Sequence, residues 1–200
     1  MKDLRLLLLD RDDTITQNQA RPGDYINDPD EIELIPGILE RLQEWADNGW
    51  QMALISNQGG VEKEFLTMDK CVQGFRRTLN LAPMIERAYF CPEAHPAAGK
   101  AIGIVELDGN YLIEDFMPSN RTLAEKFGRR YQTEAFVPGR GLVEVFRVPP
   151  CRKPNSGMAE YAISDFISTN PDIRSIEIIY VGDRPEDEEA AAALGVPFLL

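Results

Sequence analysis

The sequence is poor in cysteine. Three cysteines occur among 200 residues, at positions 71, 91 and 151, and their wide spacing is not typical of a disulfide framework. Disulfide-rich proteins occur mainly in oxidising compartments, so a sequence without a disulfide framework predicts a location in the reducing cytoplasm.

Long hydrophobic runs are also absent. The apolar run at 6–9 is too short for a signal peptide, and far shorter than the roughly 20 apolar residues that cross a bilayer. The sequence has no internal repeat and no low-complexity segment. We therefore expect no membrane partner.

Positive charge is scarce. The chain has 21 Lys and Arg against 33 Asp and Glu, which gives a formal net charge of −12. A broad nucleic-acid-binding surface needs a basic footprint, so this balance disfavours a nucleic-acid partner. A small anionic substrate needs only a local basic pocket and remains compatible with the composition.

Strand and helix signals alternate along the chain. Two hundred residues make one domain, or one domain with an insert. Repeated strand–helix–strand units predict an α/β fold, a Rossmann-like and mainly parallel sheet with helices on both faces. Residues 15–35 are polar and turn-rich, and we expect a long loop there. Strands are expected at 4–9, 50–56, 87–91, 175–181 and from 196, and helices at about 36–48, 61–79, 157–167 and 186–194.

Residues 97–150 interrupt this alternation. From 97 to 153, nine Lys or Arg outnumber seven Asp or Glu, so positive charge is concentrated in this part of an acidic chain. We expect a core made of 1–96 and 151–200 with a small inserted cap subdomain at 97–150. The insert is expected to hold a hairpin, a short helix and a strand, at 101–116 (turning at 108–110), 121–131 and 141–148.

Polar residues follow the ends of several expected strands. In a parallel sheet the carboxyl ends meet at one edge, where ligands bind, so these side chains should converge. They are Asp10, Asp12, Ser56, Asn57, Cys91 and Asp183. Clustered carboxylates suit a hard divalent cation such as Mg²⁺, which would offset their mutual repulsion. Asp10 and Asp183, from two strand ends, are the candidate metal ligands.

The spacing of Asp10 and Asp12 also indicates chemistry. Two residues apart in an extended chain, their side chains point to the same side. One carboxylate could attack a phosphoryl group and form an aspartyl-phosphate, while the other handles a proton. A solvated acidic loop is the alternative interpretation of this pair taken alone.

Four motifs resemble those of the haloacid dehalogenase (HAD) superfamily. They come in that family's order and span nearly the whole chain, as "LLLLDRDDT" (6–14), "ALISN" (53–57), the lysine of "CRKP" (151–154) and "IYVGDRPED" (179–187). The resemblance implies that Asp10 is the nucleophile and a Mg²⁺ ligand. It implies that Asp12 is the general acid/base, with its backbone carbonyl on the metal. Asp183 would hold the metal, with Asp187 in a supporting role.

The same resemblance assigns the phosphate contacts. Ser56 and Asn57 would bind the phosphoryl oxygens, and Lys153 would neutralise charge on the nucleophile and the phosphate. Positive charge aimed at a transferring group is usually the largest catalytic contribution.

A narrower resemblance concerns one branch of the superfamily. The segments "DRDDTI", "SNQGGV", "CPEAHP" and "CRKPNSGM" are similar to those of histidinol-phosphate and heptose-bisphosphate phosphatases. This similarity implies that Arg152 is a second phosphate contact. Asp13 stands where the branch has glycine, which adds a charge beside the nucleophile.

The structural zinc site of that branch is not expected here. The branch uses two pairs of Cys and His ligands, whereas Cys91 and His95 lie four apart and Pro149 stands where a cysteine belongs. With Cys151 only three ligands remain, one fewer than a tetrahedral zinc site needs.

The leading hypothesis is therefore a magnesium-dependent phosphatase of a small phosphorylated metabolite, such as a sugar phosphate or histidinol phosphate. Two alternatives stay open. Polynucleotide 3′-phosphatases share similar Asn-Gln and Lys-Pro signatures, and Asp13 suggests a non-catalytic HAD-like binding module. The sequence leaves the oligomeric state open.

Overall fold

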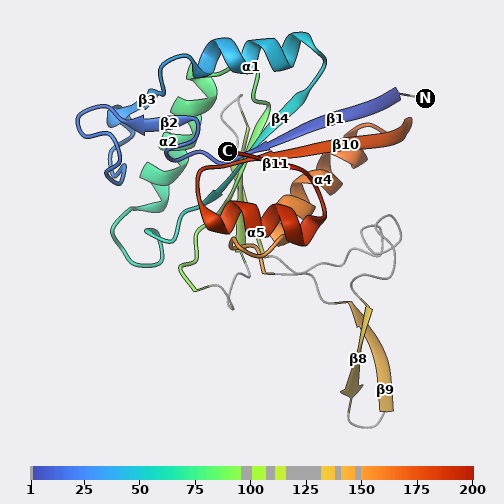
Figure 1. The fold of residues 1–200 in the computed structure, drawn as a ribbon. Coiled ribbons are helices and arrows are strands. Elements are labelled where there is room, and N and C mark those ends of the chain that lie inside the picture. Colours follow the sequence, from blue (N-terminus) through green and yellow to red (C-terminus); the bar gives the residue numbers. More distant parts are fainter. Residues whose placement is uncertain (1, 96–100, 107–110, 116–131, 138–140, 147–149) are drawn as a thin grey trace.

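A seven-stranded sheet forms the centre of the computed structural model (Figure 1), which describes residues 2–95, 101–106, 111–115, 132–137, 141–146 and 150–200. The strand order is β11-β10-β1-β4-β5-β6-β7. Five strands run parallel, namely β1 (Lys2–Leu9), β4 (Gln51–Asn57), β5 (Arg87–Cys91), β10 (Ile173–Val181) and β11 (Phe198–Leu199). The predicted α/β fold with a mainly parallel sheet is confirmed.

The leucines of β1 explain why this strand lies between two layers. Leu6 and Leu8 join the core on one face of the sheet, and Leu7 and Leu9 join the core on the other, each at most 2 % exposed. Each buried leucine contributes about 1.5–3 kcal/mol relative to an exposed one. The run therefore fixes β1 in the middle of the sheet, with Asp10 at its end.

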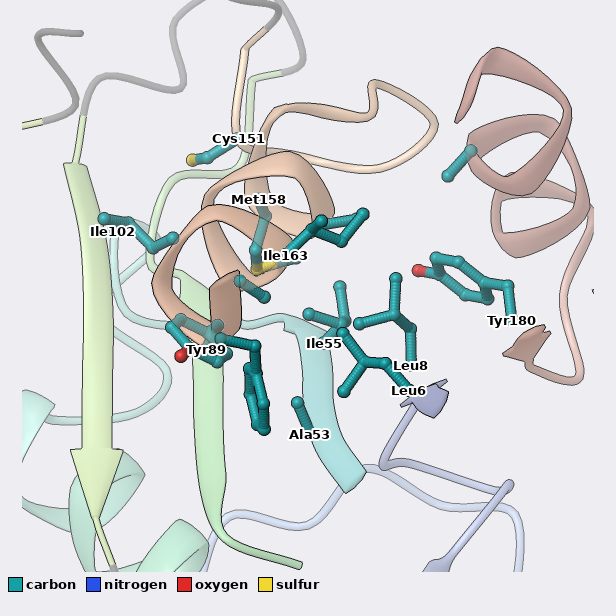
Figure 2. Close-up of a cluster of buried hydrophobic side chains, with 14 of the residues drawn as sticks. Leu6, Leu8, Ala53, Ile55, Tyr89, Ile102, Cys151, Met158, Ile163 and Tyr180 are labelled. Carbon is teal, nitrogen blue, oxygen red and sulfur yellow. The ribbon is translucent and has the colours of Figure 1, made fainter. Parts of the chain in front are cut away.

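Helices cover both faces of the sheet. On the face of Leu6 and Leu8, α4 (Gly157–Thr169) and α5 (Pro185–Leu194) contribute buried side chains such as Met158 and Ala190. Figure 2 shows this cluster, with Leu8 and Ile55 directed toward the same core as Met158 and Ile163. On the other face lie α1 (Ile38–Asp47) and α2 (Met68–Leu81). Among the described helices, none is both long and apolar enough to cross a membrane.

One expected helix begins later than the sequence indicated. The spacing predicted a helix over 61–79, but α2 begins at Met68, after Thr67, whose side chain accepts a hydrogen bond from the Lys70 amide. Residues 58–66 form a loop with Glu64 at φ 60°. This left-handed conformation is incompatible with a continuous helix. Phe65 lies in this loop and is 75 % exposed.

The expected loop at 15–35 also contains ordered structure. Thr16–Asn18 (β2) and Ile32–Leu34 (β3) pair antiparallel, with a short 3₁₀ helix at Pro29–Glu31. Period-2 patterns of three residues are too short to identify from sequence. The side chain of Asn18 is fully buried and accepts hydrogen bonds from the amides of Ala20 and Arg21, which orders the start of the connecting loop.

The interrupting segment contributes two pairs of strands. The expected hairpin forms as β6 (Ala101–Glu106) and β7 (Tyr111–Asp115), and β6 pairs antiparallel with β5, so the hairpin extends the central sheet. A second antiparallel pair, β8 (Gln132–Val137) and β9 (Gly141–Phe146), forms a separate ribbon that lies away from the main sheet (Figure 1). The expected turn at 108–110 and helix at 121–131 lie outside the described residues.

Candidate active site

A buried lysine joins two carboxylates at the end of β1. Lys153 places its Nζ 2.5 Å from Oδ1 of Asp10 and 2.5 Å from Oδ1 of Asp187, and donates to the carbonyl of Ile55 at 3.1 Å. Lys153 is 4 % exposed and Asp187 is fully buried. Because three acceptors surround one ammonium group, the position of this side chain is closely determined.

The pKa values at this centre reflect burial and charge together. Burial raises the pKa of Asp10 to about 6, because desolvation penalises the carboxylate, and Lys153 offsets only part of this effect. Burial alone would lower the pKa of Lys153, but the carboxylates of Asp10 and Asp187 raise it above its usual value. Lys153 is therefore a permanent positive charge beside Asp10.

Three carboxylates form a group that suits a metal ion. Oxygens of Asp10, Asp183 and Asp187 lie within 4.8 Å of one another. The Thr14 hydroxyl lies 3.3 Å from Oδ2 of Asp10 and 3.1 Å from Oδ1 of Asp183, and it donates to one of them at a time. An all-oxygen donor set fits Mg²⁺. Both oxygens of Asp187 already accept hydrogen bonds, one from Lys153 and one from the Arg184 amide. Asp10 uses only Oδ1 for Lys153, so its Oδ2 and the carboxylate of Asp183 are left for the ion.

Asp183 and Asp187 are positioned at this centre by the start of α5. Gly182 follows β10, and Pro185 occupies the first turn of the helix, where its missing amide proton is not needed. The Asp187 side chain accepts a hydrogen bond from the Arg184 amide at 3.2 Å. A side chain at Gly182 would overlap Asp187, because its Cβ would lie 2.5 Å from the Asp187 Cβ. Glycine therefore lets the strand end approach the helix.

The predicted general acid, Asp12, is held by two neighbours. Its Oδ1 accepts hydrogen bonds from Nε and Nη2 of Arg11 at 2.9 and 2.7 Å, and its Oδ2 accepts one from Nε2 of Gln58 at 2.8 Å. Gln58 also donates to Oγ of Ser56 at 2.9 Å. The guanidinium of Arg11 lies over the ring of Phe75, 4.3 Å from its centroid. Asp12 does not belong to the three-carboxylate group, and it lines the adjoining cavity.

Asn57, a predicted phosphate contact, holds the backbone beside Lys153. Its Nδ2 donates to the carbonyl of Lys153 at 3.1 Å, and its Oδ1 accepts from the amide of the same residue at 3.0 Å. The end of β4 is thereby joined to the segment that carries the buried lysine. In this structure the side chain of Asn57 positions Lys153.

An open cavity of about 470 Å³ adjoins this centre. Asp12, Asn57 and Arg152 line it, together with residues of the loops at 23–27 and 58–66. Arg152 donates from Nη1 to the carbonyl of Glu93 at 3.0 Å, and burial lowers its pKa. The structure thus brings the residues predicted at the strand ends to one edge of the sheet. Ser56 among them is buried and accepts a hydrogen bond from Gln58.

Asp13, the departure from the branch pattern, occupies a special backbone position. Its φ is 63°, in the left-handed region that favours glycine and that aspartate tolerates better than most residues. Its Oδ2 lies 3.3 Å from Nη2 of Arg184. The extra negative charge is therefore paired with a nearby cation.

A family model described as polynucleotide kinase 3 phosphatase matches residues 5–192. The chain belongs to this family. The membership confirms the predicted HAD resemblance and makes the chain a phosphatase.

Two curated relatives of this phosphatase are named as heptose-1,7-bisphosphate 7-phosphatases. A D-glycero-beta-D-manno-heptose-1,7-bisphosphate 7-phosphatase of Salmonella typhi is 25 % identical over 202 residues, which cover 98 % of this chain and 78 % of the relative. A D-glycero-D-manno-heptose-1,7-bisphosphate 7-phosphatase of Thermosynechococcus vestitus is 28 % identical over 99 residues, so there the match covers 46 % of this chain and about half of the relative (48 %). The predicted resemblance to the heptose-bisphosphate phosphatase branch is confirmed.

A solved structure shows the same fold. The D,D-heptose 1,7-bisphosphate phosphatase from B. bronchiseptica, complexed with magnesium and phosphate, aligns with a TM-score of 0.57 at 20 % identity. The alignment covers 98 % of this phosphatase and 79 % of that chain.

The cysteines of this phosphatase are arranged differently from the sequence expectation. No disulfide framework was expected, but Cys91 and Cys151 are joined by a disulfide, with Cα atoms 5.9 Å apart. Their separation of 60 residues concealed this proximity, because they bracket the segment that interrupts the core. His95 is exposed, and the described residues do not group it with the two cysteines as metal ligands.

Three site residues were not singled out from the sequence. Arg11 and Gln58 hold Asp12, and Thr14 links Asp10 to Asp183. Arg11, Thr14 and Gln58 all stand inside quoted motifs, so their positions next to the named residues were the available signal. Burial of an arginine and a glutamine, at 3 % and 7 % exposed, appears only in the folded chain.

Proposed function

We propose that this phosphatase hydrolyses a phosphomonoester of a small sugar-like metabolite through an aspartyl-phosphate at Asp10, with Mg²⁺ as cofactor. The observation that supports it best is the position of Asp10, at the end of the central strand and in contact with the buried ammonium group of Lys153. The names of the curated relatives support a phosphorylated sugar as substrate.

The first step is attack of an Asp10 oxygen on phosphorus. A P–O bond to Asp10 forms, the ester P–O bond breaks, and the leaving oxygen takes a proton from Asp12. Lys153 offsets the charge gathered at Asp10 and on the phosphoryl oxygens. Asp12, held in place by Arg11 and Gln58, would carry the proton for this step in its acid form.

The second step releases phosphate. Asp12 accepts a proton from water, the water oxygen bonds to phosphorus, and the bond to Asp10 breaks, which regenerates the free carboxylate. Mg²⁺ held by Asp10 and Asp183 would neutralise phosphoryl charge in both steps. Arg152 lines the cavity and is the further cation proposed to contact phosphate.

The decisive experiment measures phosphate release with and without Mg²⁺ from sugar phosphates, histidinol phosphate and a 3′-phosphorylated oligonucleotide. The variant Asp10→Asn removes the nucleophile with little change of shape. Asp47→Asn, the same change at an exposed carboxylate on α1, is the matched control. Release that needs Mg²⁺, persists in Asp47→Asn and disappears in Asp10→Asn supports the proposal. Release that survives Asp10→Asn refutes the assigned nucleophile.

The description of the matching family favours a second candidate substrate, a 3′-phosphorylated nucleic-acid end. The chemistry at Asp10 would be unchanged. Preferred hydrolysis of the oligonucleotide, weakening steeply as salt rises, would select this candidate, because contacts with nucleic-acid phosphates are salt-dependent.

A further inference from the structure

Two aromatic side chains stand exposed at the cavity beside the candidate site. Tyr25 is 83 % exposed and Phe65 is 75 % exposed, and both line the cavity of about 470 Å³. Among the large hydrophobic residues exposed in the described part of the chain, these two are the aromatic ones. They come from separate loops, one between β2 and β3 and one before α2.

Phe65 is held outward by an ordered loop. The amides of Phe65 and Leu66 both donate to the carbonyl of Gly60, at 2.9 and 3.1 Å. Glu64, immediately before, has φ 60°, a conformation that costs energy for a residue other than glycine. The next side chain, Leu66, is 9 % exposed and packs into the core. The loop therefore buries Leu66 and presents the neighbouring ring to the cavity.

Tyr25 is anchored in a comparable way. The fully buried side chain of Asn18 donates from Nδ2 to the carbonyl of Tyr25 at 3.4 Å. The same side chain accepts from two amides at the start of the loop, as described above. The backbone at Tyr25 is thus tied to a buried side chain, while its ring is exposed.

We propose that Tyr25 and Phe65 bind the leaving group of the substrate and select phosphomonoesters that carry a ring with an apolar face. This inference rests on the proposed function, because the cavity wall that includes these rings also includes Asp12, Asn57 and Arg152. A phosphoryl group at the candidate site leaves the rest of the substrate in the same cavity. Aromatic faces stack on nucleobases and on the apolar faces of sugar rings. An acyclic polyol has no such face, so the two aromatic side chains should contribute little to its binding.

The test compares substrates with and without a ring. KM and kcat are measured with Mg²⁺ for a pyranose phosphate, a nucleoside 3′-monophosphate and glycerol 2-phosphate, which has no ring. The variants are Tyr25→Ala and Phe65→Ala, with Tyr25→Phe and Phe65→Tyr as conservative partners. Leu39→Ala is the matched control, since Leu39 is 40 % exposed on α1 and does not line the cavity.

Loss of either ring should raise KM for a ring-bearing ester on the order of tenfold, with kcat and the KM of glycerol 2-phosphate changed less than about twofold. The conservative variants and Leu39→Ala should behave like the parent. A rise in KM for the pyranose ester alone identifies a sugar ring as the group that the aromatic side chains bind. A rise for the nucleoside ester alone identifies a base. An equal rise for glycerol 2-phosphate, or no rise for either ring-bearing ester, overturns the inference.

A binding measurement separates failure of this inference from failure of the proposed function. Calorimetric titration of the same three esters into Asp10→Asn protein with Mg²⁺ requires no turnover. Binding of a ring-bearing ester that weakens about tenfold on adding Phe65→Ala supports the inference even if no phosphate is released. Binding that Phe65→Ala leaves unchanged refutes it, whatever the activity.

Discussion

The side-chain amide of Asn57 makes two hydrogen bonds with the backbone of Lys153: it donates to the carbonyl and accepts from the N–H. The two residues are 96 positions apart in the sequence. The contact joins the end of β4 to the segment that supplies the buried cation, so the geometry around Asp10 depends on it.

We expect Asn57→Ala to impair turnover more than substrate binding. Two partly buried backbone groups lose their partner, and each such loss costs about 1–3 kcal/mol. The displaced ammonium of Lys153 then stabilises the phosphoryl transition state less well. A fall in kcat of at least tenfold, with KM changed much less, is the expected result of steady-state kinetics. A purely structural role would instead lower the amount of folded enzyme with normal kcat per active site.

Lys153→Met should strongly destabilise the metal-free protein. The substitution removes the ammonium group and leaves Asp10 and Asp187 buried and facing each other. Breaking a buried ion pair in this way costs about 3–5 kcal/mol. Chemical denaturation in EDTA measures the change. Lys70→Met is the control, because Lys70 pairs with Asp28 at the surface and such pairs contribute about 0–1 kcal/mol. Equal effects of the two substitutions would contradict the assigned burial.

The raised pKa of Asp10 predicts a specific dependence of stability on pH. Burial raises this pKa from its ordinary 3.8 to about 6, so the folded state favours the protonated form. The resulting stabilisation is complete below pH 4 and is lost as pH rises through 6. Metal-free protein should therefore lose on the order of 2–3 kcal/mol relative to Asp10→Asn between pH 4 and 7. Denaturation in EDTA at several pH values tests this, and parallel curves for the two proteins would refute it.

Thiol labelling should distinguish the three cysteines. Cys71 is 1 % exposed on α2, and burial raises the pKa of its thiol to about 12, so it should resist alkylation in the native protein at pH 8. After unfolding without reductant, one thiol per chain should react, since Cys91 and Cys151 are bonded. Unfolding with reductant should expose three. Mass spectrometry counts the labels, and three labels without reductant would contradict the disulfide.

Local sequence patterns predicted an element or a site residue correctly where no tertiary contact opposed them. The leucine run predicted β1, and the acids after β1 and β10 predicted that Asp10 and Asp183 meet, which they do. The loop before α2 was wrongly predicted as helix because Phe65 continues the helical spacing, while the capping of Lys70 by Thr67 and the strained Glu64 decide the boundary. Tertiary contacts overrode the periodicity there.

Side-chain contacts between segments far apart in the sequence could not be predicted from the spacing of residues within each segment. Asn57 was predicted to contact phosphate, yet its amide holds Lys153, and only the folded chain brings β4 and this segment together. The same holds for Gln58, which connects Asp12 with Ser56. Whether these residues also contact substrate stays a prediction.

The place of β1 in the sheet has a dynamic consequence. From Leu6 to Leu9, β1 is hydrogen-bonded to β10 on one side and to β4 on the other, so the amide protons of this part should exchange with solvent only when the sheet itself opens. The loops that carry Tyr25 and Phe65 lie outside the sheet and can fluctuate without breaking any of its ladders. Substrate entry and product release can thus occur on the timescale of loop motion, while the carboxylate of Asp10 stays at the end of a central strand.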